Sequence, residues 1–229
     1  MTVVDGWFAG AATKGLPDWA DLPQPLAEAV TENVAVNSSA YLVESEHGGV
    51  DFVGNRTECA LLMLLRGWGQ DYRRKREALA AQLVTDYRRK REALATQLVT
   101  VYVFTSARKM SSALVRRKGA GLTLLCKGAA EIVVGRCTRY AGAGGAVEDL
   151  GEGLRQELLQ LVTSMASRGL RTLCLAMRGE ARLVVLSLWS FWEGGFGVGR
   201  ALSGAGRALS GARRGSDVQG PRCSLVCAD

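Results

Sequence analysis

The sequence lacks most of the features that mark membrane-spanning, secreted or metal-binding proteins. Its longest apolar run, LVVLSLWSFW at 183–192, is about half of the ~20 residues that a membrane-spanning helix requires. There is one histidine, His47, beside two glycines in an expected turn, and the six cysteines have no paired spacing across the body of the chain. No basic-then-apolar leader follows Met1. We therefore expect buried, reduced thiols in a cytosolic protein rather than disulfides or a zinc site.

Positive charge is concentrated in two segments of the chain, whose formal net charge is +7. The phrase DYRRKREALAAQLVT occurs at 71–85 and again at 86–100, with only Ala81 changed to Thr96, and the two copies together supply +4. The tail, 194–229, contains the heptapeptide GRALSGA twice in tandem and supplies +3, so the rest of the chain is neutral. The basicity is therefore local and does not indicate a fold-wide field that would steer nucleic acid.

Helical and extended patterns alternate irregularly along the remaining sequence. We expect helices after Pro23, from an N-cap at Thr57, over 131–137, and over an amphipathic stretch, 154–165, that Gly169 ends. Patterns that favour strands lie at 39–44, 50–54, 100–106, 111–117, 122–128 and 170–177. Hairpins mixed with helices, without a strand–helix–strand rhythm, predict an α+β fold: an antiparallel β-sheet flanked by helices.

Composition divides the chain into three parts. We expect a folded domain at 1–182, which contains the tandem duplication at 71–100. The apolar segment 183–193 has no evident role at this level. The tail, 194–229, is rich in Gly, Ala, Arg and Ser and has little to pack, so we expect it to be disordered.

Four motifs occur in order along the chain: NRTECALL (55–62), FTSARKMSS (104–112), LLCKGAAEIVVGRC (124–137) and SMASRGLRTLCLAMR (164–178). Together they resemble the nucleotide-binding (N) domain of a P-type ATPase, and in detail that of the plasma-membrane-type (type IIB) calcium pump. The opening MTVVDGWFAG resembles the segment that follows the phosphorylation motif of that pump, and ENVAVNSSAYLV also matches its pattern. The resemblance covers roughly residues 1–178.

The matched motifs contain the residues that this resemblance places in an ATP pocket: Glu58, Phe104, Lys109, Lys127, Gly128 and Arg171. It implies that Phe104 stacks on the base, that Lys127 is the pocket lysine and that Arg171 contacts phosphate. The residue types suit these roles, because an aromatic ring can stack on adenine and a guanidinium can pair with phosphate oxygens. Taken singly, the same residues also fit plainer roles: a core aromatic for Phe104, a first-turn helix acid for Glu58 and a surface strand residue for Arg171. The family reads R-K-S-M-S where this chain has R-K-M-S-S around Lys109.

The D-K-T-G-T motif, which carries the phosphorylated aspartate in this family, does not occur in the sequence, and neither does a membrane-spanning segment. The resemblance therefore implies binding of ATP, with Mg²⁺ in the full-length family, without turnover by this chain alone. The expected partners are ATP and the remaining domains of a calcium-transporting pump, at the cytosolic face of a membrane. The alternative is a non-catalytic protein whose basic repeat and tail bind nucleic acid or anionic membrane, although we expect no specific nucleic-acid partner. A partial gene product without an independent role is a third possibility.

The repeat itself leaves two arrangements open. In the family a basic helical stretch precedes the strand of the pocket phenylalanine, and the second copy leads into Phe104 with about the family's spacing. We interpret the first copy, 71–85, as a fifteen-residue insertion, although either copy can be regarded as the extra one. The insertion either extends one helix by about 22 Å or loops out at 85–86.

Overall fold

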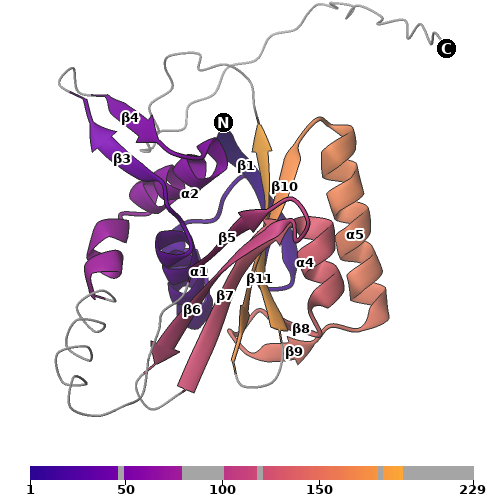
Figure 1. Cartoon of the computed structure of the whole chain (residues 1–229). Helices are drawn as coiled ribbons and strands as arrows, with labels where there is room; N and C mark the ends of the chain where they lie inside the picture. The colour runs from indigo at the N-terminus through magenta and orange to yellow at the C-terminus, as the bar shows by residue number, and fades with distance from the viewer. Residues whose placement is uncertain (46–48, 79–100, 118–120, 180–182, 193–229) are drawn as a thin grey trace, which may run out of the picture. The chain divides into compact units, whose positions relative to one another are not determined.

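A computed structural model of the chain describes residues 1–45, 49–78, 101–117, 121–179 and 183–192. Within these residues nine strands form one sheet, and two further strands form a separate hairpin (Figure 1). This confirms the predicted α+β class with its antiparallel sheet and flanking helices. The tail 194–229, His47 and most of the repeat lie outside the described residues.

The elements follow one another along the chain without a regular alternation. The strands are β1 (Thr2–Phe8), β2 (Ala11–Lys14), β3 (Tyr41–Glu44), β4 (Val50–Val53), β5 (Val101–Thr105), β6 (Met110–Arg117), β7 (Gly121–Ala129), β8 (Arg139–Ala141), β9 (Val147–Asp149), β10 (Arg171–Arg178) and β11 (Leu183–Trp192). The helices are α1 (Gln24–Val36), α2 (Arg56–Gly67), α4 (Ala130–Arg136) and α5 (Glu152–Ser167), with a short 3₁₀ helix, η1 (Trp19–Asp21).

The strand order of the large sheet is β2-β1-β11-β10-β7-β6-β5, and every neighbouring pair on this path is antiparallel. Strand β8 pairs in parallel with β11 and antiparallel with β9. The hairpins of β6 with β7 and of β3 with β4 join strands that the sequence patterns predicted. Strand β5 lies at the open end of this path.

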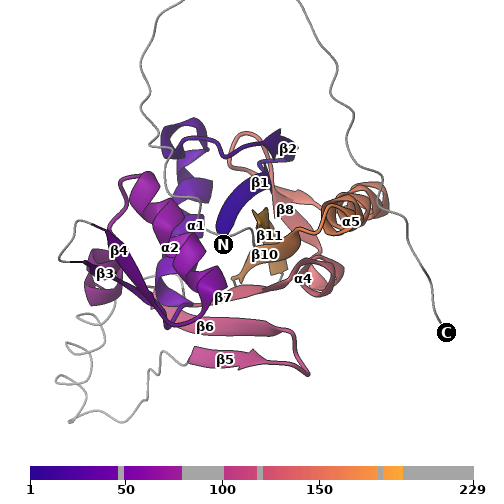
Figure 2. The same ribbon diagram turned by 90° about the horizontal axis from the view of Figure 1, so that it is seen from above.

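Helices cover both faces of the sheet, as the view from above shows: α1 and α2 lie on one face, and α4 and α5 on the other (Figure 2). Side chains alternate along each strand, so each strand contributes to both cores. In β10, for example, Leu175 packs in the core beneath α1 and α2, whereas Cys174 and Ala176 pack in the core beneath α4. We call the first side the α1/α2 face.

The apolar segment that had no evident role in the sequence is β11, an interior strand between β1 and β10. It reads as a continuous apolar run because both of its faces are covered. Trp189 and Phe191 are fully buried on the α1/α2 face, and Leu188 is fully buried on the other. The two serines in the run are also buried and are hydrogen-bonded: Ser187 Oγ accepts from the Trp189 indole at 2.6 Å, and Ser190 Oγ donates to the Asp5 carbonyl at 3.2 Å.

Helix boundaries follow local sequence signals with one correction. Helix α1 begins directly after Pro23, with a second proline in its first turn. The predicted N-cap of α2, Thr57, is wrong: the cap is Asn55, whose side-chain oxygen accepts from the amide groups of Thr57 and Glu58 at 2.8 and 3.4 Å. Helix α5 ends as predicted before Gly169, which has a φ of +75°.

Four of the six cysteines lie in the described residues, and all four are free and buried: Cys59, Cys126, Cys137 and Cys174. This confirms the expectation of buried reduced thiols for these four. Burial raises the pKa of the Cys137 thiol to about 12, so this group stays protonated near neutral pH. Cys223 and Cys227 lie outside the described residues.

Candidate functional site

A buried ion pair joins helix α2 to strand β7. The Lys127 ammonium lies 2.7 Å from Glu58 Oε1, with 7% of the lysine side chain and 16% of the glutamate side chain exposed. Lys127 also donates to the backbone carbonyl of Asn37. The charges therefore meet beneath the surface, on the α1/α2 face of the sheet, where an ion pair is screened far less than in water.

The other oxygen of Glu58 is held by the loop between α1 and β3. Its Oε2 accepts from the backbone amides of Ser39 and Ala40 at 2.9 and 3.0 Å, and from the Ser38 hydroxyl at 3.1 Å. The Ser39 hydroxyl adds a contact at 3.3 Å. The position of Glu58 in the first turn of α2 also suits a carboxylate, because the helix dipole favours negative charge there.

The protonation of this pair follows from burial and from mutual attraction. Burial alone would raise the pKa of Glu58, but the Lys127 ammonium and the hydrogen bonds from Ala40 and Ser39 outweigh it and hold the pKa below its usual value. Burial lowers the pKa of Lys127, against the opposing attraction of Glu58, and the charge of Arg76 lowers it further. Glu58 is thus a carboxylate near neutral pH.

Close packing of the neighbouring backbone positions Lys127 on β7. Lys127 pairs with Ser111 on β6 and with Leu175 on β10. The next residue, Gly128, has no room for a side chain: a Cβ there would lie 2.5 Å from the Lys109 carbonyl oxygen. Glycine at this position therefore lets the turn before β6 pack directly against β7.

Phe104 lies on β5 with 60% of its surface exposed. Thr105 pairs with Met110, and a bulge separates this pair from the pair of Tyr102 with Ser112. Side chains alternate from Thr105, so Phe104 lies on the opposite face of the sheet from Met110. Ser111 and Lys127 also lie on this opposite face. The strand positions therefore place an exposed aromatic ring on the α1/α2 face, two strands from the buried lysine.

The two remaining cationic residues, Arg171 and Lys109, lie on β10 and in the turn before β6, the strands on either side of β7. Arg171 is the first residue of β10 and is exposed. It shares its face with Leu173 and Leu175, and therefore with Lys127. Lys109 is exposed in the turn before β6 with a φ of +50°, and its carbonyl accepts from the Ala129 amide at 3.0 Å.

Of the residues predicted from sequence, the structure brings Glu58 and Lys127 into direct contact and packs Gly128 against the backbone of Lys109. Phe104 and Arg171 lie on the same face of the sheet as the pair, on β5 and β10. Sequence reasoning missed the loop residues Ser38, Ser39 and Ala40, which bind Glu58 mostly through hydroxyl and backbone groups. The two serines in the motif ENVAVNSSAYLV were the available signal.

Two buried asparagines, Asn33 in α1 and Asn37 at its C-cap, were also missed and connect this helix to the sheet. Asn33 donates from Nδ2 to the carbonyls of Cys126 and Ala176 at 3.1 and 3.0 Å. Asn37 donates from Nδ2 to the carbonyls of Ser111 and Leu125 at 3.4 and 3.3 Å. Asn37 Oδ1 and Ser111 Oγ are buried without a hydrogen-bond partner in the described structure, so unsatisfied acceptors lie beside the Lys127 position.

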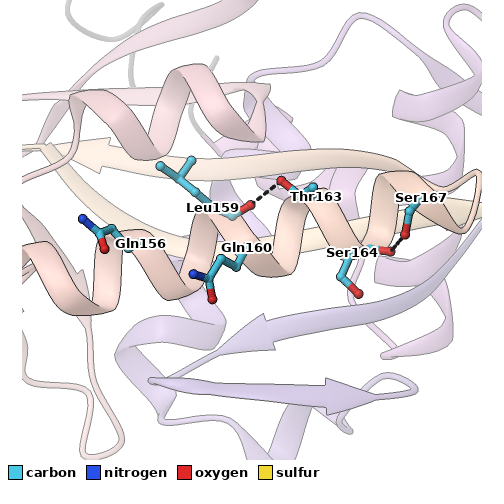
Figure 3. Close-up of a pocket in the computed structure, with 6 residues that line it drawn as sticks. All are labelled: Gln156, Leu159, Gln160, Thr163, Ser164 and Ser167. Carbon is cyan, nitrogen blue, oxygen red and sulfur yellow. Dashed lines mark hydrogen bonds between the residues drawn. The ribbon is translucent and has the colours of Figure 1, made fainter.

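A shallow pocket elsewhere on the domain has no part in this cluster. It lies along the outer side of α5 and is lined by Gln156, Leu159, Gln160, Thr163, Ser164 and Ser167 (Figure 3). Its hydroxyls at Thr163 and Ser167 donate to carbonyls of their own helix, at 2.9 Å each. The pocket contains no ionisable side chain, and it lies across the sheet from α1 and α2 (Figure 2).

Comparison with known proteins decides the family. Residues 25–182 match the model of the P-type ATPase cytoplasmic domain N. The chain belongs to this family. This N domain is 32% identical over 180 residues to the calcium-transporting ATPase PAT1 of Dictyostelium discoideum and 33% identical over 192 residues to the plasma membrane calcium-transporting ATPase mca-1 of Caenorhabditis elegans. It is 31% identical over 183 residues to the human plasma membrane calcium-transporting ATPase 1.

Each of these matches covers 78% of this chain and 14% of the longer relative. The N domain therefore spans about a seventh of the proteins it resembles. In the part of the chain that the structure describes, no helix is long and apolar enough to cross a membrane. In the same residues, no group of three or more His, Cys, Asp or Glu side chains is arranged to hold a metal ion.

Proposed function

We propose that this N domain binds ATP on the α1/α2 face of its sheet and that it is the nucleotide-binding module of a calcium-transporting P-type ATPase. One observation carries the proposal: the buried Glu58–Lys127 pair lies on the same sheet face as the exposed ring of Phe104. The family match and the names of the relatives support the nucleotide and the transported ion, respectively.

The aromatic ring supplies the affinity for the base. Phe104 is a large apolar side chain left mostly uncovered on the edge strand, where its ring can stack on adenine. Stacking of a base on an aromatic side chain contributes about 1–3 kcal/mol. The exposed ring thus provides a platform at one end of the proposed pocket.

The buried lysine supplies a positioned charge. An ammonium has three N–H donors, and Lys127 directs two of them to Glu58 and to the Asn37 carbonyl. We infer that the third donor meets the nucleotide, and that Glu58 acts chiefly as a positioning residue. The carboxylate already accepts bonds at both oxygens, although Oε1 retains a lone pair for an exocyclic amine.

The remaining predicted residues, Arg171 and Lys109, act at the phosphate end of the proposed pocket. Arg171 supplies a forked guanidinium, which suits phosphate oxygens, and Lys109 supplies a second cation on an exposed turn. Mg²⁺ would arrive bound to the phosphates of ATP. Without the D-K-T-G-T aspartate, the chain by itself binds the nucleotide and does not transfer its phosphate. We further propose the other pump domains as its partners, at the cytosolic face of a membrane.

Titration of the chain with Mg²⁺–ATP, followed by calorimetry, tests the proposal. Phe104→Ala should weaken binding by about 5- to 150-fold, because about 1–3 kcal/mol of stacking is lost. Lys127→Ala should also weaken it. Tyr102→Ala is the matched control, since this residue of the same strand is 48% exposed and pairs with Ser112 on the opposite face. Unchanged affinity in both the Phe104 and Lys127 variants would overturn the assignment of the pocket.

The alternative of a basic surface for nucleic acid or anionic membrane gains no support from the described part of the repeat. Arg73 and Arg76 donate to backbone carbonyls of the domain itself. Part of the repeat's positive charge is therefore used within the fold, and we do not propose this function.

A further inference from the structure

The beginning of the first repeat copy docks on the domain. Residues 72–78 are helical, and Asp71 caps this helix by accepting from the Arg73 amide at 2.9 Å. The side chain of Tyr72 is buried with 6% exposed, and its hydroxyl accepts from the amide of Leu42 on β3 at 2.9 Å. Arg73 donates to the carbonyl of the same Leu42.

Arg76 makes the second half of this contact, at the end of α1. Its Nε donates to the Ala35 carbonyl at 2.6 Å, and a terminal nitrogen donates to the Ser38 carbonyl at 3.0 Å. The guanidinium also lies 4.8 Å above the Tyr72 ring. We call the backbone groups of Ala35, Ser38 and Leu42 the motif receptor.

The residues that contact the motif receptor form a sequence pattern that occurs twice in the chain. Its contacts come from a tyrosine followed one and four residues later by arginines, with an aspartate before the tyrosine. The second copy repeats this spacing with Asp86, Tyr87, Arg88 and Arg91. The single difference between the copies, Ala81 against Thr96, lies outside the docking motif.

We propose that residues 86–91 of the second copy are an alternative occupant of the motif receptor, so that the domain holds either copy, one at a time. Replacing the first copy by the second at the receptor moves fifteen residues from the linker after the docked helix to the linker before it. The free-energy cost of loop closure depends only weakly on such a change in length. The first copy is favoured because it follows α2 directly, where the Gln70 amide donates to the Leu65 carbonyl at 2.8 Å. The second copy therefore takes over when the first is weakened.

The occupied receptor also supports the nucleotide site. Ser38 accepts from Arg76 through its carbonyl and donates to Glu58 through its hydroxyl. Docking of either copy thus holds the loop that holds Glu58. The duplication therefore supplies a second, interchangeable segment that stabilises this loop.

Hydrogen exchange of the Leu42 amide in the full chain tests the proposal, since this amide is bonded to the docked tyrosine. The first variant is Tyr72→Ala with Arg76→Ala, the matched control is Tyr87→Ala with Arg91→Ala, and the third variant carries all four changes. The control should leave exchange unchanged, and the first variant should stay protected because the second copy docks. The four-substitution variant should exchange about 100-fold faster, because neither copy then offers a tyrosine hydroxyl to the Leu42 amide.

Equal loss of protection in the first variant and in the four-substitution variant would overturn the proposal, as would no loss in the latter. If alanine prevents folding, the tyrosines alone are changed, as Tyr72→Leu, Tyr87→Leu and both together. Leucine keeps an apolar side chain and removes the hydroxyl that accepts from the Leu42 amide, so the same pattern is expected. Protection in the first variant should not change on ten-fold dilution. A dependence on dilution would mean that the occupant comes from a second chain, which also overturns an exchange within one chain. None of these outcomes depends on ATP binding.

Discussion

Replacing Lys127 with methionine leaves the Glu58 carboxylate without its ammonium partner and the Asn37 carbonyl without a donor. The pair is buried, so the lost attraction is not replaced by full hydration. Breaking a buried ion pair by removing one partner costs about 3–5 kcal/mol. Glu58 keeps 16% of its side chain exposed and retains its bonds to the loop, so we expect a loss of about 3 kcal/mol, at the lower end of that range.

Urea unfolding at neutral pH, followed by tryptophan fluorescence, measures this loss. Glu58→Gln should also cost about 3 kcal/mol, because it leaves the lysine charge buried. The double variant should cost less than the sum, with a coupling energy of about 2 kcal/mol between these contacting residues. The exposed pair of Arg66 and Glu44, also 2.7 Å apart but with side chains 47% and 65% exposed, is the matched control. Arg66→Met should cost no more than about 1 kcal/mol.

Additive effects of Lys127→Met and Glu58→Gln, each as small as that of Arg66→Met, would refute the reasoning. They would show that water and the loop replace the ion pair at little cost. A double variant that is more stable than either single variant would agree with it, because two uncharged side chains leave no unpaired charge.

Two further predictions concern the same region. Gly128→Ala should destabilise the domain by about 1–3 kcal/mol in thermal unfolding, because its Cβ would lie 2.5 Å from backbone. Gly135→Ala, in α4 with nothing within 4 Å of its Cβ, should instead stabilise by about 0.5–1 kcal/mol; equal effects of the two would contradict the packing argument. Since the pKa of Glu58 is lowered on folding from 4.5, its contribution to stability should be complete above that pH and lost as the pH falls below it. Urea midpoints should therefore fall less steeply with acid in Glu58→Gln than in the parent chain, and identical slopes would contradict the assignment.

Part of the candidate site was predicted from the sequence, and part of it was not. The resemblance of the motifs to the family placed Glu58 and Lys127 in one pocket, and the structure places them 2.7 Å apart although they lie 69 positions apart in the chain. The two serines of the loop at Ser38 and Ser39 were the available signal, but the loop was not predicted to hold Glu58, because its backbone amides, which also bind the carboxylate, leave no mark in the sequence. The N-cap of α2 was misplaced by two positions, since Asn55 and Thr57 are both good capping residues and only the backbone conformation distinguishes them.

The sequence by itself determined the fold class, the hairpins and the family, because alternating apolar positions, turn residues and ordered motifs are local features of the chain. Only the tertiary structure decided the role of β11, because a ten-residue apolar run is compatible with several buried environments until its neighbours are known. It also decided which repeat copy is docked. Two nearly identical copies have the same local preferences, so the choice depends on which one reaches Leu42 and Ser38 after the chain leaves α2.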